Sequence, residues 1–169
     1  ATLGGRIFAA GLVGDDNAAK GLSGILQEKS VDVSGFIKDA NRSTISKTRI
    51  VAGGRTTVSQ QIVRVDKESK EPMGKAQEQQ LEEYLKQVLP QVKGVVLSDY
   101  GSGTITDKLL GQIFAYCQEH NIPTIVDSRY DILRFKTVDY IKQNDAELSA
   151  AIGRDLATEE ELVQGGCEL

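Results

Sequence analysis

The sequence predicts an α/β fold in which helices pack on both faces of a mostly parallel β-sheet. Short apolar runs, the first over 7–13, have the length and flanking glycines of buried parallel strands. Stretches with apolar residues at a helical period follow these runs. The segment 31–66 differs, because it is rich in Val, Ile, Thr and Ser and has no helical period. We expect it to form two or three antiparallel strands.

The predicted elements alternate along the chain. The strand over 7–13 leads into a helix capped by Asp15 or Asp16. After the β-rich segment we expect a helix over 78–92, a strand over 94–98, a helix over 106–120, strands over 124–126 and 138–141, and a helix from about Asp145. A last helix begins at Glu159, and we expect it to break at Gly165-Gly166. This alternation indicates a parallel sheet between helix layers.

Composition excludes several classes of protein. The 169 residues are 40% hydrophobic and carry a net charge of −4 without a basic stripe, which fits one globular domain and argues against a nucleic-acid partner. No apolar run is long enough to cross a membrane and no cleavable leader is visible, so we expect a cytoplasmic protein. Cys117 and Cys167 lie far apart, and we expect Cys117 to be a buried, reduced thiol.

Each predicted parallel strand ends in a polar cluster. Asp99, Asp127 and the pair Asn144 and Glu147 follow the later strands, and the carboxyl ends of parallel strands meet at one edge, where ligands bind. Carboxylates there can accept sugar hydroxyls or hold magnesium, so Asp127 and Glu147 are candidate metal ligands. The alternative is that these acids cap helices, which we favour for the acids that follow the first strand. For Asp99 both interpretations stay open.

Two motifs have a structural interpretation beside the functional one. Gly101 and Gly103 suggest a dinucleotide-binding loop, but Thr106 stands where that motif needs a third glycine. Thr106 as the N-cap of the next helix is the simpler interpretation. Asn144 and Glu147 have the spacing of a capping box, and spacing alone favours that structural role.

The β-rich segment carries a cluster of cations. Lys47 and Arg49 alternate onto one face of a predicted strand, and Arg64 lies on its expected partner strand. Three cations close together could receive a substrate phosphate. The alternative is a solvated strand face on which these cations pair with Asp66.

The chain resembles the ribokinase-like (PfkB-type) carbohydrate kinases, and within them the D-glycero-D-manno-heptose-7-phosphate kinase group of ADP-heptose synthesis. The matching segments are GLVGDD at 11–16, VDVSG at 31–35, TRIVAGG at 48–54 with QQIVRVDKE at 60–68, and LSDYG at 97–101. They follow in the family's order over nearly the whole chain.

The resemblance implies a fold and an activity. The fold is a three-layer ribokinase-like core over 1–169, incomplete at both ends, with a small β lid over 31–66. The activity is ATP-dependent phosphorylation of a sugar or sugar phosphate, heptose 7-phosphate above all, with Mg²⁺. Asp99 would contact sugar hydroxyls, while Asn144 and Glu147 would lie near the nucleotide phosphates and magnesium. Lids of this family often mediate dimerisation, so a homodimer through the lid is a further expectation.

The sequence departs from the family pattern at three places. Gln143 replaces a proline before Asn144, and Ser102 replaces a lysine typical of the heptose kinase group. The glycine-rich sugar motif and the segment with the catalytic base fall outside the chain, so we expect the base beyond Leu169 and an inactive chain. The rival interpretations are a signalling receiver domain, which has no room for the 31–66 insert, and a noncatalytic module that dimerises through the lid.

Overall fold

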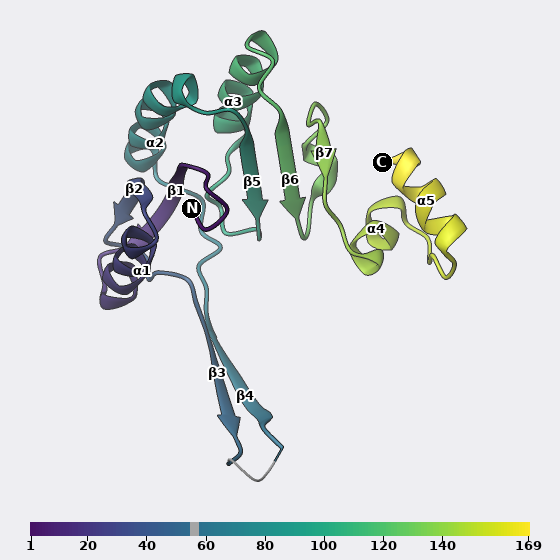
Figure 1. The fold of residues 1–169 in the computed structure, drawn as a ribbon, viewed down its shortest axis with the longest axis horizontal. Coiled ribbons are helices and arrows are strands. Elements are labelled where there is room, and N and C mark those ends of the chain that lie inside the picture. The colour runs from purple at the N-terminus through teal and green to yellow at the C-terminus, as the bar shows by residue number, and fades with distance from the viewer. Residues whose placement is uncertain (55–57) are drawn as a thin grey trace. The chain divides into compact units, whose positions relative to one another are not determined.

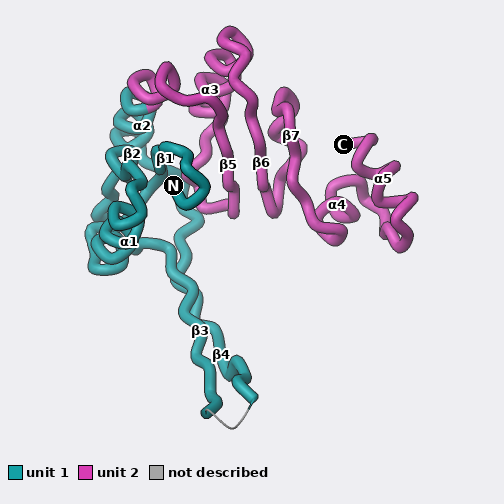
Figure 2. Tube along the Cα trace, in the orientation of Figure 1, with its two compact units in different colours: residues 1–84 teal, residues 85–169 magenta. Residues whose placement is uncertain are grey.

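The computed structural model describes residues 1–54 and 58–169. The chain forms two compact units, 1–84 and 85–169, drawn in different colours in Figure 2. Among the described residues, no helix combines the length and the apolar character that crossing a membrane requires.

The first unit begins with a parallel β-α-β arrangement. Strand β1 (Ile7–Gly14) and strand β2 (Val31–Asp39) pair in parallel, and helix α1 (Asn17–Glu28) connects them. Asp16 is the N-cap of α1, which confirms the capping interpretation. Val13 of β1 and Ile37 of β2 are buried. These strands and α1 therefore form an ordinary parallel α/β unit.

An antiparallel hairpin follows, and it extends away from β1, α1 and β2 (Figure 1). It consists of β3 (Ser46–Ala52) and β4 (Gln60–Lys67), and we call residues 46–67 the hairpin. The expected insert over 31–66 is wrong in its first part, because β2 is parallel to β1. Glycine at position 35 lets β2 lie close to the backbone and side chains of β1, which places 31–39 inside the α/β unit. Residues 55–57 of the expected insert lie outside the described residues.

The second unit contains the other parallel sheet. Helix α2 (Lys75–Val88) and the short 3₁₀ helix η1 (Leu89–Gln91) lead into this part of the chain. The sheet has the order β5-β6-β7, and all its described pairs are parallel. Its elements are β5 (Val95–Asp99), α3 (Asp107–Glu119), β6 (Thr124–Ser128), the 3₁₀ helix η2 (Ile132–Arg134) and β7 (Tyr140–Ile141). The alternating strands and helices therefore form a parallel sheet, as the sequence predicts.

The core of the second unit forms from β5, β6 and α3. Leu97 and Val126 lie in neighbouring register positions and are buried, as are Leu109, Leu110, Ile113 and Cys117 of α3. The buried, free thiol of Cys117 confirms the expectation. Burial raises the pKa of this thiol, which disfavours the reactive thiolate.

Two helices follow β7, α4 (Asp145–Ile152) and α5 (Glu159–Glu168). The predicted break at Gly165-Gly166 is wrong, since α5 is continuous through both glycines. A Cβ at position 165 would lie 3.0 Å from the side chains of Ile152 and Leu156. Gly165 therefore permits close packing of α5 on the preceding segment and does not end the helix.

Candidate functional site

The carboxyl ends of β5, β6 and β7 bring the predicted polar residues to one edge of the sheet, which we call the carboxyl edge. The register pairs Asp99 with Ser128 and Ser98 with Asp127 at the ends of β5 and β6. Asn144 caps the helix that begins shortly after β7. Because all three strands are parallel, their polar termini share this edge, as the sequence predicts.

Asp99 is held in a defined orientation at this edge. The residue is only 6% exposed. Its Oδ1 accepts a hydrogen bond from the Gly101 amide at 3.0 Å, and its Oδ2 accepts one from the Ser128 hydroxyl at 3.2 Å. A carboxylate can accept roughly four hydrogen bonds, so these two contacts leave acceptor capacity. Asp99 is thus a fixed oxygen acceptor whose position depends on its neighbours.

The loop 100–106 after β5 is a turned segment that leads into α3. Gly101 and Gly103 have φ angles of +67° and +72°, in the left-handed region that favours glycine. The hydroxyls of Ser102 and Thr104 lie 3.0 Å apart in a hydrogen bond. Thr106 accepts a hydrogen bond from the Leu109 amide at 3.3 Å, which confirms it as the N-cap of α3. The two glycines therefore allow the backbone to make this turn.

Asn144 and Glu147 form the capping box of α4. The Glu147 amide donates to Asn144 Oδ1 at 2.8 Å, and the Asn144 amide donates to Glu147 Oε2 at 3.1 Å. The structural interpretation of this pair is therefore observed. The N-terminus of this helix follows β7 closely in the chain, and the N–H groups and positive dipole end of a helix N-terminus favour anions.

Asp127 and Glu147 are the candidate magnesium ligands. Asp127 forms an ion pair with Lys142 at 3.2 Å. Among the described residues, no three His, Cys, Asp or Glu side chains gather in a way that could hold a metal ion. Magnesium in nucleotide sites is usually bound through one or two carboxylates together with phosphates and waters. These residues therefore fit magnesium brought by nucleotide phosphates, and they do not fit a site made by protein alone.

The hairpin brings the three predicted cations onto one face. Arg49 lies directly opposite Arg64, and Lys47 lies opposite Asp66. Lys47 Nζ contacts Glu68 at 2.6 Å and Asp66 at 3.5 Å, and the Glu68 contact raises the pKa of Lys47. Arg64 Nε contacts Asp66 at 2.9 Å. The pairing alternative is thus observed for Lys47 and Arg64.

Arg49 is different from these two cations. It has no ion pair within the described residues, and its cross-strand neighbour is another arginine. Like charges directly opposite each other destabilise a strand pair. Residues that bind a ligand often show such locally destabilising arrangements.

Sequence reasoning missed three residues that organise these regions. Thr44 donates its hydroxyl to Asp16 at 2.7 Å and its amide to the same carboxylate at 2.9 Å. Arg42 lies at the base of the hairpin, and Arg134 lies beside Asp99. The contacts of Thr44 with Asp16, of Arg42 with Ser69 and of Arg134 with Asp99 span 27 to 35 positions in the sequence, so no local pattern predicts these contacts.

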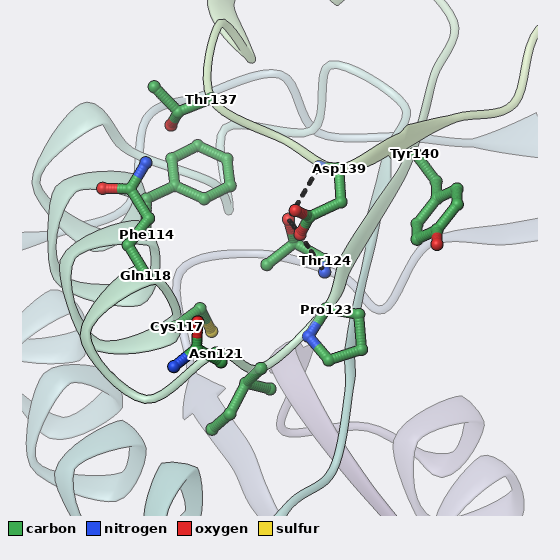
Figure 3. Close-up of a pocket in the computed structure, with 10 residues that line it drawn as sticks. Phe114, Cys117, Gln118, Asn121, Pro123, Thr124, Thr137, Asp139 and Tyr140 are labelled. Atoms are coloured by element: carbon green, nitrogen blue, oxygen red, sulfur yellow. Dashed lines mark hydrogen bonds between the residues drawn. The ribbon is translucent and has the colours of Figure 1, made fainter.

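A cavity of about 370 Å³ lies at the opposite edge of the sheet, beside the amino ends of β6 and β7 (Figure 3). Its polar centre is Asp139, whose carboxylate accepts hydrogen bonds from the Thr124 amide and hydroxyl, both at 2.7 Å. These bonds lower the pKa of Asp139. The Asp139 carboxylate is already hydrogen-bonded to Thr124, and none of the predicted site residues line the cavity. We therefore place the candidate site at the carboxyl edge.

The chain is similar to curated proteins that are longer than it is. It is 34% identical over 165 residues to the bifunctional protein HldE of Geobacter metallireducens, which covers 97% of this chain and 33% of that protein. The HldE of Hyphomonas neptunium is 37% identical over 163 residues, with 95% and 32% covered. The chain thus spans about a third of the length of these curated relatives.

Solved structures share the fold. A ribokinase from Arabidopsis thaliana, complexed with ribose and ATP, matches with a TM-score of 0.66 and 18% identity over 96% of this chain and 51% of that one. A 2-dehydro-3-deoxygluconokinase from Thermotoga maritima matches with a TM-score of 0.71 and 12% identity over 95% and 53%. The family model described as pfkB family carbohydrate kinase matches residues 1–168. The chain therefore belongs to the pfkB family of carbohydrate kinases.

Proposed function

We propose that this chain forms part of an ATP-dependent kinase that phosphorylates a hydroxyl of a sugar phosphate, heptose 7-phosphate in the first place. The family and the similarity to HldE proteins support the class of reaction. The observation that carries the proposal is the carboxyl edge, where Asp99, Asp127 and Asn144 lie at or just beyond the ends of neighbouring parallel strands. Phosphoryl transfer depends mainly on positioning and on charge stabilisation, and this edge offers fixed groups for both.

Each of the two units offers candidate groups for binding a sugar phosphate. Asp99 would accept a sugar hydroxyl with the acceptor capacity that Gly101 and Ser128 leave. Independently, Arg49 and its cross-strand neighbour Arg64 on the hairpin are candidates for binding a phosphate group, because guanidinium groups bind phosphate oxygens in pairs. Lys47 would contribute less, since Glu68 and Asp66 already compensate its charge.

ATP would be received at the start of α4. The Asn144 cap fixes this helix N-terminus, and Glu147 would act on magnesium through water, with Asp127 as a second carboxylate at the same edge. The magnesium ion would compensate phosphate charge when it is bound. The residues of this chain would hold and orient the nucleotide.

We further propose that the 169-residue chain alone does not catalyse phosphoryl transfer. It covers about half of each solved kinase named above. On one face of the β5-β6-β7 sheet the register row Val96, Ile125 and Tyr140 is 73%, 38% and 60% exposed. Parallel sheets normally have both faces covered, so this open face also fits an incomplete kinase domain.

The hairpin offers a surface for a homodimer. Ile50 lies opposite Val63 and Thr48 lies opposite Val65, on the face that points away from Arg49. Ile50, Val63 and Val65 are 50%, 44% and 53% exposed. A noncatalytic module that dimerises through this face is the second candidate function. Size-exclusion chromatography before and after deletion of residues 46–67 tests the dimer, and an unchanged elution volume contradicts it.

Two measurements on the chain test the proposed kinase role. Isothermal titration with heptose 7-phosphate, glucose and ATP with Mg²⁺ should show binding of the sugar phosphate and the nucleotide, and much weaker binding of the neutral sugar. A coupled assay of ATP turnover with the same sugars should stay at background. Absence of both binding events contradicts the kinase role, whereas turnover well above background contradicts only the proposed inactivity.

A further inference from the structure

Arg134 connects three segments that meet around Asp99. Its Nη2 donates to the Ile105 carbonyl at 3.0 Å and to Asp107 Oδ1 at 2.7 Å. Its Nη1 lies 4.0 Å from Asp99 Oδ2, and its Nε lies 4.0 Å from Asp131. One side chain thus contacts the end of β5, the start of α3 and its own 3₁₀ helix.

The backbone of Arg134 is itself well anchored. It closes η2, and its neighbours Ile132 and Phe135 are 5% and 2% exposed. The Arg134 side chain is 28% exposed, and its guanidinium carbon lies 5.8 Å from the centroid of the Phe135 ring. The guanidinium is planar and carries several fixed donors, so it loses less conformational freedom per hydrogen bond than a flexible ammonium would. It is therefore suited to holding neighbouring segments in place.

Arg134 holds the loop 100–106 in place. Asp99 Oδ1 accepts from the Gly101 amide at the start of the loop, and Arg134 binds the Ile105 carbonyl at its end. Between them, Gly103 has a φ angle of +72°, which glycine adopts without strain. Arg134 and Asp99 therefore hold the two ends of this turned segment.

We propose that Arg134 is a positioning residue for the carboxyl edge: it holds loop 100–106 and orients the Asp99 carboxylate for a sugar hydroxyl. This inference rests on the proposed function in its second part only. The hold on the loop is a property of the chain without any ligand. Loss of the guanidinium releases the Ile105 carbonyl, removes the cation beside Asp107 and Asp99, and leaves the Asp99 carboxylate held by Gly101 and Ser128 alone.

The first test follows amide hydrogen exchange by NMR in the ligand-free chain. In Arg134→Met, the Gly101 amide should exchange about tenfold faster or more, because charge-assisted hydrogen bonds that close the local structure are lost. The Val126 amide, in the core strand, should keep its rate. Lys136→Met is the matched control, since it removes one positive charge from the same segment at an exposed side chain. The exchange rate of the Gly101 amide in Arg134→Lys should lie between those of wild type and Arg134→Met, because lysine keeps the positive charge but lacks the paired N–H donors of arginine.

The second test measures heptose 7-phosphate binding by isothermal titration. Arg134→Met should weaken binding, and the double variant with Asp99→Asn should bind no more weakly than Asp99→Asn alone. Such non-additivity is expected only if Arg134 acts through Asp99. Additive losses overturn the orienting role, and Lys136→Met should bind like wild type.

The outcomes of the two tests separate the two proposals. An unchanged Gly101 exchange rate in Arg134→Met, or the same acceleration in Lys136→Met, overturns the positioning role. If Arg134→Met does not fold, the comparison of Arg134→Lys with Lys136→Met decides the same point. If the wild-type chain does not bind the sugar phosphate, the proposed function fails, while the exchange rates still decide whether Arg134 holds the loop.

Discussion

The hydroxyl of Thr44 donates a hydrogen bond to Asp16 Oδ1 at 2.7 Å and accepts one from the Gly14 amide at 2.9 Å. This buried threonine ties the segment that enters the hairpin to the N-terminus of α1. The segment that leaves the hairpin is tied as well, because Arg42 Nη2 donates to the Ser69 hydroxyl at 3.3 Å and to the Glu71 carbonyl at 2.5 Å. Strands β3 and β4 are exposed at nearly every residue, and the chain on either side of the hairpin is fixed by these hydrogen bonds.

The Asp16 contacts make stability depend on pH in the acid range. Hydrogen bonds from the Ala19 amide and from the Thr44 amide and hydroxyl lower the pKa of Asp16 from 3.8 to about 2. The folded-state pKa is depressed, so the stabilising effect is complete above the unfolded value of 3.8 and is lost as pH falls toward 2. Asp16→Asn can still cap α1 and should flatten this dependence.

Urea unfolding of wild type and Asp16→Asn at several pH values between neutral and strongly acid tests this expectation. The difference in unfolding free energy between the two proteins should shrink as pH falls. Asp15→Asn is the control, because the contact between Asp15 and Lys38 is exposed to solvent. A difference that stays constant over the whole range contradicts the assigned role of Asp16.

Two glycine substitutions should change stability in opposite directions. A Cβ at Gly14 would lie 2.6 Å from the Arg42 carbonyl and 2.7 Å from the Thr44 amide, so Gly14→Ala must displace the base of the hairpin. A Cβ at Gly111 meets nothing within 4 Å, and this residue lies inside α3. Gly111→Ala should therefore stabilise by about 0.5–1 kcal/mol through helix propensity. Thermal unfolding followed by circular dichroism measures both changes, and stabilisation by Gly14→Ala refutes the close packing.

Local sequence signals predicted the elements that depend on neighbouring residues. Thr106 as a helix cap, Cys117 on a buried helix face and the polar strand ends all follow from short-range patterns and strand order. Long-range partners carry no such signal, which is why Thr44 and Arg134 were missed. Gly165 was misread because a glycine that breaks a helix and one that permits close packing look the same in sequence.

The capping box of α4 allows structure and function to be separated. Glu147→Gln should keep the reciprocal hydrogen bond, because glutamine serves in capping boxes as glutamate does. It should nevertheless weaken Mg²⁺-dependent ATP binding by about tenfold or more, as loss of an outer-shell magnesium partner does. Glu161→Gln is the matched control, since Thr158 and Glu161 form the same box on α5. Equal effects of both substitutions on ATP binding, measured by isothermal titration, count against a nucleotide role for Glu147.

Arg49 should matter for binding and not for folding. Arg49→Gln removes the like-charge contact with Arg64, so the melting temperature should not fall. Affinity for heptose 7-phosphate should fall, and the remaining binding should depend less on salt because one charge contact is lost. Lys20→Gln, on the exposed side of α1, is the control. If Arg49→Gln lowers the melting temperature and leaves the affinity for heptose 7-phosphate unchanged, Arg49 serves folding and not binding.

The most direct test of the proposed substrate site is a titration of the isotopically labelled chain with heptose 7-phosphate, followed by amide NMR shifts. The proposed sugar site predicts shift changes at Gly101 and its loop, with no change at Thr124 and Asp139. Shift changes confined to the cavity beside Thr124 and Asp139, or none at saturating sugar phosphate, contradict the assignment of the carboxyl edge as the sugar site.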